Sequence, residues 1–345
     1  MGNDQAISDA DLMEVGLIYV EEQKPGITRV KCGRGFSFRR VNGKVVKDPK
    51  RRARLLALAV PPSYTDVWYC PSPNGHLQAT GFDSKGKKQY FYHPLWEELR
   101  DRNKFSLMED FGKELPSFRR KIAYRIKHSE DGKEKLLCAM LRILDKTGMR
   151  IGNAVSTETN QTYGLTTLRK QHISVDRETV HFSFKGKGGV LIKCELYDPG
   201  LARALEECIH WRGVHIFAFR DAAGRRHQIR SEDINNFIHE HMGPAFSAKD
   251  FRTWRFSTLF LEELVRQRKR GDPSLKSVFE EIVAHTCNTP AILKSSYIHP
   301  GLLELCRQGK EARLPDSPAP TRGLQKAEAL LLAYLQSAGA NTTLF

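Results

Sequence analysis

The stretch Ile173-Ser-Val-Asp-Arg-Glu-Thr-Val-His-Phe-Ser-Phe-Lys-Gly-Lys-Gly-Gly-Val-Leu-Ile-Lys-Cys194 decides the fold class. It holds three short runs rich in β-branched and aromatic residues, and two tight turns, at residues 176–178 and 185–189, separate them. Runs of this kind between turn residues predict consecutive antiparallel strands. We therefore expect a three-stranded meander, and the regions on either side of it are helical in pattern.

Amphipathic patterns predict the helices of these flanking regions. Residues 133–146 give the strongest pattern, because their apolar side chains fall on one helical face. These side chains are Leu136, Leu137, Met140, Ile143 and Leu144. Further helices are expected at residues 95–111, 115–129, 198–212, 231–241, 250–270, 274–285 and 324–336.

The chain before His93-Pro94 has a different pattern, in which β-prone runs alternate with turns such as Asn74-Gly75. Strands are expected at residues 17–20, 27–32, 36–41, 66–70, 76–80 and 89–92, with one helix at 48–58 that Asp48 caps. The sequence thus predicts an α+β protein in three parts. They are a flexible lead-in at residues 1–13, a small β-rich N-terminal domain at 14–94, and a larger, mainly α-helical domain at 95–345 that contains the three-stranded antiparallel sheet.

Composition points to a polyanionic partner, which can be DNA, RNA or an anionic membrane surface, and it favours a nucleic acid. Lys and Arg number 55 against 40 Asp and Glu, which gives a net charge of +15 at pH 7. A surplus of this size favours a polyanion, because a basic surface attracts phosphates over a distance. No apolar run reaches the length of a membrane span, and no secretory leader is visible. Seven cysteines without a Cys-x-x-Cys motif fit a reducing compartment, so we expect a cytoplasmic protein with no membrane partner.

Several kinds of chemistry lack their motifs in this sequence. The histidines do not form a His-Glu-x-x-His pair, and the acidic residues do not cluster as in a two-metal nuclease. None of the Gly-Lys pairs is followed by Ser or Thr, so the phosphate-binding loop of an ATPase is missing. We therefore expect neither a metal nor another cofactor.

A phosphodiester can still be cut by side chains alone. The reaction needs a nucleophile, cations that neutralise the non-bridging oxygens, and an acid that protonates the leaving 5′-oxygen. Arg suits the second task because its guanidinium donates two parallel hydrogen bonds. Tyr297, in the polar run at residues 288–300, is the candidate nucleophile, although a tyrosine in such a run is ordinarily a packing residue.

Six motifs give the sequence a resemblance to a known family. In chain order they are Arg150-Ile-Gly-Asn153, Tyr163-Gly-Leu-Thr-Thr-Leu168, Phe184-Lys-Gly-Lys187, Lys249-Asp-Phe-Arg252-Thr-Trp254, Asn288-Thr-Pro290 and Lys294-Ser-Ser-Tyr297-Ile-His-Pro300. This order resembles that of the type IB DNA topoisomerases, in particular the small bacterial and poxvirus-type enzymes. Residues 61–68, 74–81 and 87–92 resemble the N-terminal domain of the same enzymes. The resemblance covers nearly the whole chain and implies the fold shared by type IB topoisomerases and tyrosine recombinases.

The resemblance implies a role for each matched residue. Tyr297 would attack the scissile phosphate and form a 3′-phosphotyrosyl bond, while Arg150 and Arg252 would bind the non-bridging oxygens. Lys187, in the turn of a hairpin, would be the general acid toward the 5′-oxygen. Asn288 stands where many relatives carry His, so it would donate a neutral hydrogen bond. Taken singly, each of these residues also fits an ordinary structural role.

Four more residues match DNA-contacting positions. Lys249 lies three residues before Arg252 and corresponds to a basic residue near the site. In the N-terminal domain, Gln89, Tyr90 and Tyr92 resemble residues that touch DNA. Tyr90 and Tyr92 would share one face of a strand, because strand side chains alternate with a period of two. Packing in the core is the alternative for this pair.

The expected function is that of a type IB DNA topoisomerase. A monomer would close around duplex DNA at the nucleoid, cut one strand, let it swivel and rejoin it without ATP or metal. A tyrosine recombinase is one alternative, although recombinases usually carry His-x-x-Arg where this chain has Lys249-Asp-Phe-Arg252. A basic DNA-binding protein without catalysis is the other. Because the matched residues come from distant segments, DNA binding can be part of their assembly, with Tyr297 away from the phosphate position beforehand.

Overall fold

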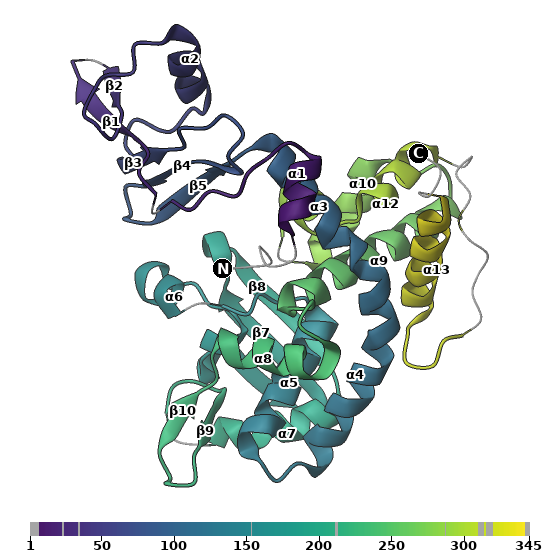
Figure 1. Cartoon of the computed structure of the whole chain (residues 1–345). Helices are drawn as coiled ribbons and strands as arrows, with labels where there is room; N and C mark the ends of the chain where they lie inside the picture. Colours follow the sequence, from purple (N-terminus) through teal and green to yellow (C-terminus); the bar gives the residue numbers. More distant parts are fainter. Residues whose placement is uncertain are drawn as a thin grey trace. The chain divides into compact units, whose positions relative to one another are not determined.

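A computed structural model describes residues 7–22, 24–33, 35–152, 154–210, 213–286, 288–309, 314 and 320–341. The chain divides into two compact units, Met1–Ser106 and Leu107–Phe345, and Figure 1 draws the helices and strands of both. Among the described residues, no helix has both the length and the apolar character needed to cross a membrane.

The first unit is built around an antiparallel sheet. In spatial order its strands are β2 (Gly35–Arg39), β1 (Ile27–Cys32), β3 (Thr65–Tyr69), β4 (Leu77–Phe82) and β5 (Lys88–Tyr92). Helix α2 (Pro49–Ala57) begins at Asp48, whose side chain accepts a hydrogen bond from the backbone of Arg51 at 2.7 Å. Leu55 of α2 packs in one core with Ile27 and Phe38 of the sheet. The predicted β-rich character of the N-terminal region is confirmed, whereas residues 17–20, expected as a strand, contribute an isolated bridge between Ile18 and Gly75.

The lead-in predicted as flexible is helical from residue 9. Helix α1 (Asp9–Glu14) buries Leu12, which packs in one cluster with Trp96 and Leu99. Both of those residues belong to α3 (Pro94–Ser106). This packing explains why the structure groups α3 with the first unit, whereas the sequence placed the domain boundary after residue 94. The apolar face of α1 is short, so its partner on α3 is not evident from sequence periodicity.

The second unit is mainly helical. Its helices are α4 (Met108–His128), α5 (Gly132–Thr147), α6 (Ala154–Asn160), α7 (Pro199–His210), α8 (Ser231–Met242), α9 (Ala248–Arg268), α10 (Leu275–His285), α11 (Pro290–Ser296), α12 (Pro300–Arg307) and α13 (Lys326–Asn341). Helix α5 packs against α4, α7, α8 and α9, which places it at the centre of the unit. Its apolar residues are almost fully buried, as its amphipathic pattern predicts.

The break between α3 and α4 falls at Leu107, and not at residues 112–114 as the sequence predicted. Gly112 lies inside α4, with its α-carbon against the ring of Trp254. A Cβ at this position would overlap that indole. The glycine therefore permits close packing of α4 on α9 and does not end the helix.

The predicted meander is present. Its strands are β6 (Ile173–Asp176), β7 (Thr179–Lys185) and β8 (Leu191–Tyr197), paired in the order β6-β7-β8. Val180, Phe182 and Phe184 of β7 are buried, so their face of the sheet packs on the helices. A second hairpin, β9 (Ala218–Arg220) with β10 (Arg226–Gln228), was not predicted. Its strands are short and rich in Arg, so they lack the apolar alternation by which strands are recognised.

Candidate active site

Arg252 lies on α9 and is anchored by the end of another helix. Its side chain is 7% exposed. Its Nε donates a hydrogen bond to the carbonyl oxygen of Gly148 at 2.7 Å. Gly148 is the C-cap of α5 and adopts the left-handed conformation, with φ 64°, which suits glycine because it has no Cβ. A Cβ there would also lie 2.9 Å from the ring of Phe256. This anchor fixes the direction of the guanidinium.

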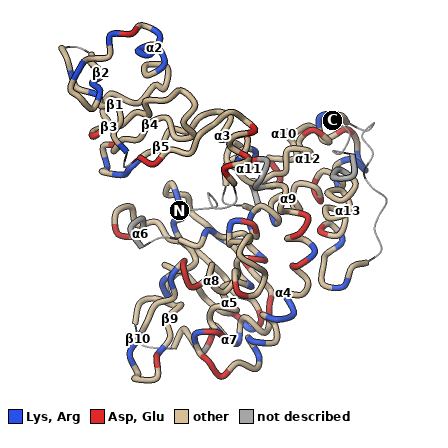
Figure 2. Tube along the Cα trace, in the orientation of Figure 1, with Lys and Arg blue, Asp and Glu red and all other residues tan. Residues whose placement is uncertain are grey.

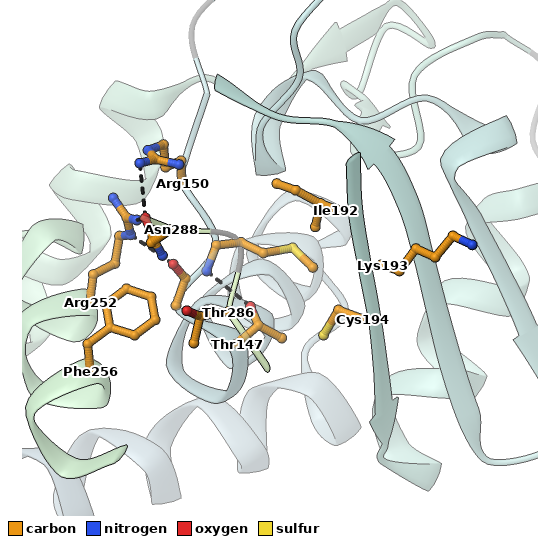
Figure 3. Close-up of a pocket in the computed structure, with 11 residues that line it drawn as sticks. Thr147, Arg150, Ile192, Lys193, Cys194, Arg252, Phe256, Thr286 and Asn288 are labelled. Carbon is orange, nitrogen blue, oxygen red and sulfur yellow. Dashed lines mark hydrogen bonds between the residues drawn. The ribbon is translucent and has the colours of Figure 1, made fainter. Parts of the chain in front are cut away.

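Arg150 and Arg252 meet at one amide. Nη2 of Arg150 donates to Oδ1 of Asn288 at 3.0 Å, and Nη2 of Arg252 reaches the same oxygen at 3.4 Å. Figure 3 shows both guanidiniums directed at Asn288 from two sides. Since the oxygen accepts from both arginines, the NH2 group is the donating end of Asn288.

Tyr297 follows the last residue of α11, and its hydroxyl accepts a hydrogen bond from Nη1 of Arg252. The same guanidinium lies over the tyrosine ring, with Cζ 4.3 Å from the ring centroid. The Tyr297 side chain is 8% exposed. The structure thus brings Tyr297 into contact with Arg252.

The backbone around Tyr297 is held by Ser257, a residue that the sequence did not single out. The Ser257 hydroxyl donates to the carbonyl oxygen of Tyr297 at 2.9 Å and accepts from the backbone N–H of His299 at 3.0 Å. Ser257 is fully buried on α9, five residues after Arg252. A serine inside an otherwise apolar helix face was the available signal, because a buried hydroxyl needs partners.

The electrostatics of this cluster are dominated by two cations. Burial lowers the pKa of Arg252 to about 10, and neighbouring Arg150 adds to the lowering, whereas Tyr297 opposes it. Arg252 therefore keeps its charge at neutral pH. Within the described part of the chain, no carboxylate lies within ion-pair distance of Arg150 or Arg252. Two arginines without a carboxylate form a site suited to an anion.

A pocket opens beside the two arginines. It is lined by Thr147, Gly148, Met149, Arg150, Ile192, Lys193, Cys194, Arg252, Phe256, Thr286 and Asn288. Figure 3 shows Lys193 directed away from the pocket, on the opposite face of β8 from Ile192. The sheet thus supplies one wall of the pocket, and the ends of α5 and α9 supply the charge.

Lys187 lies in the turn between β7 and β8, at residues 187–189, and is exposed. Gly188 and Gly189 adopt positive φ values of 80° and 78°, which requires glycine-like freedom in this turn. The hairpin is tied to the segment that follows Arg150, because the N–H of Tyr163 donates to the carbonyl of Lys185 at 2.7 Å.

The segment after Arg150 is held by a close contact of two backbones. The N–H of Leu165 donates to the carbonyl of Arg150 at 2.8 Å. A Cβ on Gly164 would lie 2.5 Å from the α-carbon of Gly152. Glycine at both positions therefore allows the two segments to touch, which explains why each motif contains one. Asn153 lies outside the described residues.

The other predicted residues lie at the start of α9 and in the first unit. Lys249 is exposed in the first turn of α9. Gln89, Tyr90 and Tyr92 belong to β5 of the first unit. The rings of Tyr90 and Tyr92 stack with centroids 6.2 Å apart, so they share one face as predicted. Tyr90 is 47% exposed, which argues against core packing for that ring.

Comparison with known proteins shows the family of the chain. The family model for the catalytic core of eukaryotic DNA topoisomerase I matches residues 89–301. The model for the N-terminal domain of bacterial DNA topoisomerase IB matches residues 35–83. The DNA topoisomerase 1B of Acanthamoeba polyphaga mimivirus is 27% identical over 298 residues, covering 83% of this chain and 89% of that protein. The DNA topoisomerase 1B of Vaccinia virus (strain Copenhagen) is 24% identical over 237 residues, covering 66% and 71%. The first model matches more than half of the sequence, and the chain therefore belongs to the type IB DNA topoisomerase family.

Proposed function

We propose that the protein relaxes supercoiled duplex DNA by cutting and rejoining one strand through Tyr297. The observation that carries this proposal is the contact between the Tyr297 hydroxyl and Arg252, inside a pair of arginines that no described carboxylate neutralises. Family membership and a net charge of +15 support DNA as the substrate.

In the cleavage step, the phenolic oxygen of Tyr297 would form a bond to phosphorus while the bond from phosphorus to the 5′-oxygen breaks. The phenol proton leaves to solvent, and the hydrogen bond from Arg252 stabilises the phenolate. Arg150 and Arg252 would donate to the non-bridging oxygens, where negative charge grows in the transition state. The NH2 group of Asn288, which both arginines orient, would add a neutral donor.

Lys187 would protonate the departing 5′-oxygen. Its place in an exposed hairpin turn supports this role, because such a turn can enter a groove of the duplex. After the nicked strand has swivelled, the 5′-hydroxyl attacks phosphorus, returns its proton and releases Tyr297. The covalent bond to Tyr297 conserves the energy of the phosphodiester, so no nucleotide is consumed.

DNA contacts outside the catalytic cluster complete the proposal. Lys249 would meet a phosphate near the site, and β5, which carries Gln89, Tyr90 and Tyr92, would meet the duplex from the first unit. Lys and Arg occur in both units, as the blue segments of Figure 2 show. The enzyme would act as a monomer at the nucleoid.

The test is a denaturing-gel assay for a covalent adduct. Its substrate is a duplex in which the fragment with the new 5′-hydroxyl is short and diffuses away after cleavage, so that religation is prevented. The wild type should form the adduct in EDTA, and Tyr297→Phe should form none and should fail to relax plasmid DNA. Relaxation by Tyr297→Phe would reject the mechanism. Resolution of Holliday junctions by a tetramer on DNA would favour a recombinase, and salt-dependent binding without any adduct would favour a non-catalytic protein.

A further inference from the structure

Two neighbouring apolar residues are exposed at the end of the β7–β8 hairpin. Val190 is 47% exposed and Leu191 is 55% exposed, whereas the next residue, Ile192, is 9% exposed. We call Val190 and Leu191 the apolar tip. A single exposed apolar residue needs no explanation, but an adjacent pair beside a proposed catalytic group, Lys187, indicates a contact surface.

The apolar tip has a defined shape and a basic rim. The N–H of Gly186 donates to the carbonyl of Val190 at 2.8 Å, and the N–H of Gly189 donates to the carbonyl of Gly186 at 3.0 Å. These bonds close the turn that carries Lys187. Leu191 pairs with Lys185 across the two strands, and Lys193 follows on the same outward face of β8.

We propose that the apolar tip packs against the deoxyribose rings of the DNA minor groove and thereby positions Lys187 at the leaving 5′-oxygen. This inference rests on the proposed function of Lys187. DNA is the occupant that the charges favour, because phosphates border the minor groove on both sides and lysines border the apolar tip. Leu and other apolar side chains are those that proteins place in this groove.

The need for such a contact follows from the chain around Lys187. Its ammonium sits on a flexible four-carbon stem, and two glycines follow it directly. Neither feature holds the ammonium at one oxygen. An apolar contact three and four residues further on would fix the turn against the duplex. The apolar tip is therefore a positioning element and makes no contact with the reacting atoms.

The test compares Leu191→Ser and Val190→Ser with Val214→Ser, which changes a 57% exposed valine elsewhere in the same unit. Single-turnover cleavage is measured on an ordinary strand and on one with sulfur at the bridging 5′ position, whose thiolate leaves without a proton. On the ordinary strand, Leu191→Ser should slow cleavage by about tenfold, a part of the roughly 10²- to 10⁴-fold that a general acid supplies. On the sulfur strand it should match the wild type, and Leu191→Met should restore the ordinary rate.

The inference would be overturned if Leu191→Ser slowed cleavage equally on both strands. It would also be overturned if Leu191→Ser and Val190→Ser cleaved the ordinary strand no more slowly than Val214→Ser does. Thermal melting of each variant checks the fold, which substitutions at exposed positions should leave intact. The proposed function fails in a different way, since the wild type would then form no adduct on either strand.

Discussion

The side chain of Ser257 donates a hydrogen bond to the backbone carbonyl of Tyr297 at 2.9 Å, from the same helix that carries Arg252. The same hydroxyl accepts from His299 at 3.0 Å. One buried serine thus holds the backbone on both sides of the proposed nucleophile. Arg252 and Tyr297 are held relative to each other through α9.

Ser257→Ala tests whether the hydrogen bonds of Ser257 position Tyr297 for reaction, because it leaves Arg252 on the same helix unchanged. Removal of the hydroxyl leaves a buried carbonyl and a partly buried N–H without this partner, which should lower the free energy of unfolding by about 2 kcal/mol. Adduct formation should slow by about tenfold, because the tyrosine loses its fixed position. DNA binding, measured at one salt concentration, should stay unchanged.

Thr258→Val is the matched control for that serine. The hydroxyl of Thr258 is buried on the same helix, and no hydrogen-bond partner for it exists among the described residues. Its removal should leave stability equal or raised, since an unpaired buried hydroxyl is unfavourable. If Thr258→Val slowed adduct formation as much as Ser257→Ala, the effect would reflect packing in α9 and not the bonds to Tyr297.

Arg252→Lys should reduce adduct formation by about 100-fold or more, although it keeps a positive charge. A lysine ammonium cannot donate to Gly148, Tyr297 and Asn288 together from fixed directions. The rate of the first turnover measures the effect. Arg255→Lys, on the same helix, should retain nearly the full rate, and a comparable loss there would point to a general requirement for arginine in α9.

Gly164→Ala should impair the site through the backbone. The added Cβ would lie 2.5 Å from the α-carbon of Gly152 and 2.7 Å from the carbonyl oxygen of Arg150, so the segment of Arg150 must shift. We expect slower adduct formation and a stability loss of about 1–3 kcal/mol. Gly132→Ala is the control, because among the described residues nothing beyond the neighbouring turn lies within 4 Å of a Cβ at the start of α5. A Gly164→Ala variant with the wild-type rate would show that Arg150 tolerates this shift.

A buried ion network predicts how stability depends on pH. Arg119 of α4 binds Asp145 of α5 at 2.8 Å and Glu328 of α13 at 2.7 Å, and Glu328 also accepts from Trp254 at 3.2 Å. Burial raises the pKa of Glu328, but the hydrogen bond and charge of Arg119 outweigh it, so the pKa lies below the ordinary 4.5. The unfolded chain therefore binds this proton more readily than the folded protein.

It follows that the contribution of Glu328 is fully present above about pH 4.5 and is lost as the pH falls through the lower folded pKa. Glu328→Gln should lower stability by about 3 kcal/mol at pH 7, because Arg119 loses a charged partner. The difference from the wild type, measured by denaturant unfolding, should shrink below pH 4.5. A difference that stays constant down to pH 3 would contradict the ionic contribution.

Local patterns predicted a large part of the fold. The meander was recognisable because its turns are marked by glycine and charged residues, and α2 because Asp48 caps it. Helix α1 and the continuation of α4 through Gly112 were not, because they involve packing on distant residues, namely Trp96 and Trp254. The hairpin of β9 and β10 carries too few apolar residues to show alternation.

In the candidate site too, local motifs predicted some residues, and contacts between distant segments determine the others. The motifs placed Arg150, Arg252, Asn288 and Tyr297 on a short list, and the structure brings these four together. The supporting contacts from Gly148 and Ser257 join segments 104 and 40 residues apart. No local pattern reveals which carbonyl a buried arginine will meet, so these supports could come only from the folded chain.

The backbone bonds at Tyr163 and Leu165 have a mechanical consequence. Through these two bonds, the segment from Tyr163 to Leu165 connects the hairpin of Lys187 to the carbonyl of Arg150. A displacement of the hairpin would therefore be transmitted to the backbone of Arg150 through two hydrogen bonds. Since Arg150 also donates to Asn288, such a displacement would reach the cluster around Tyr297 from the side of the sheet.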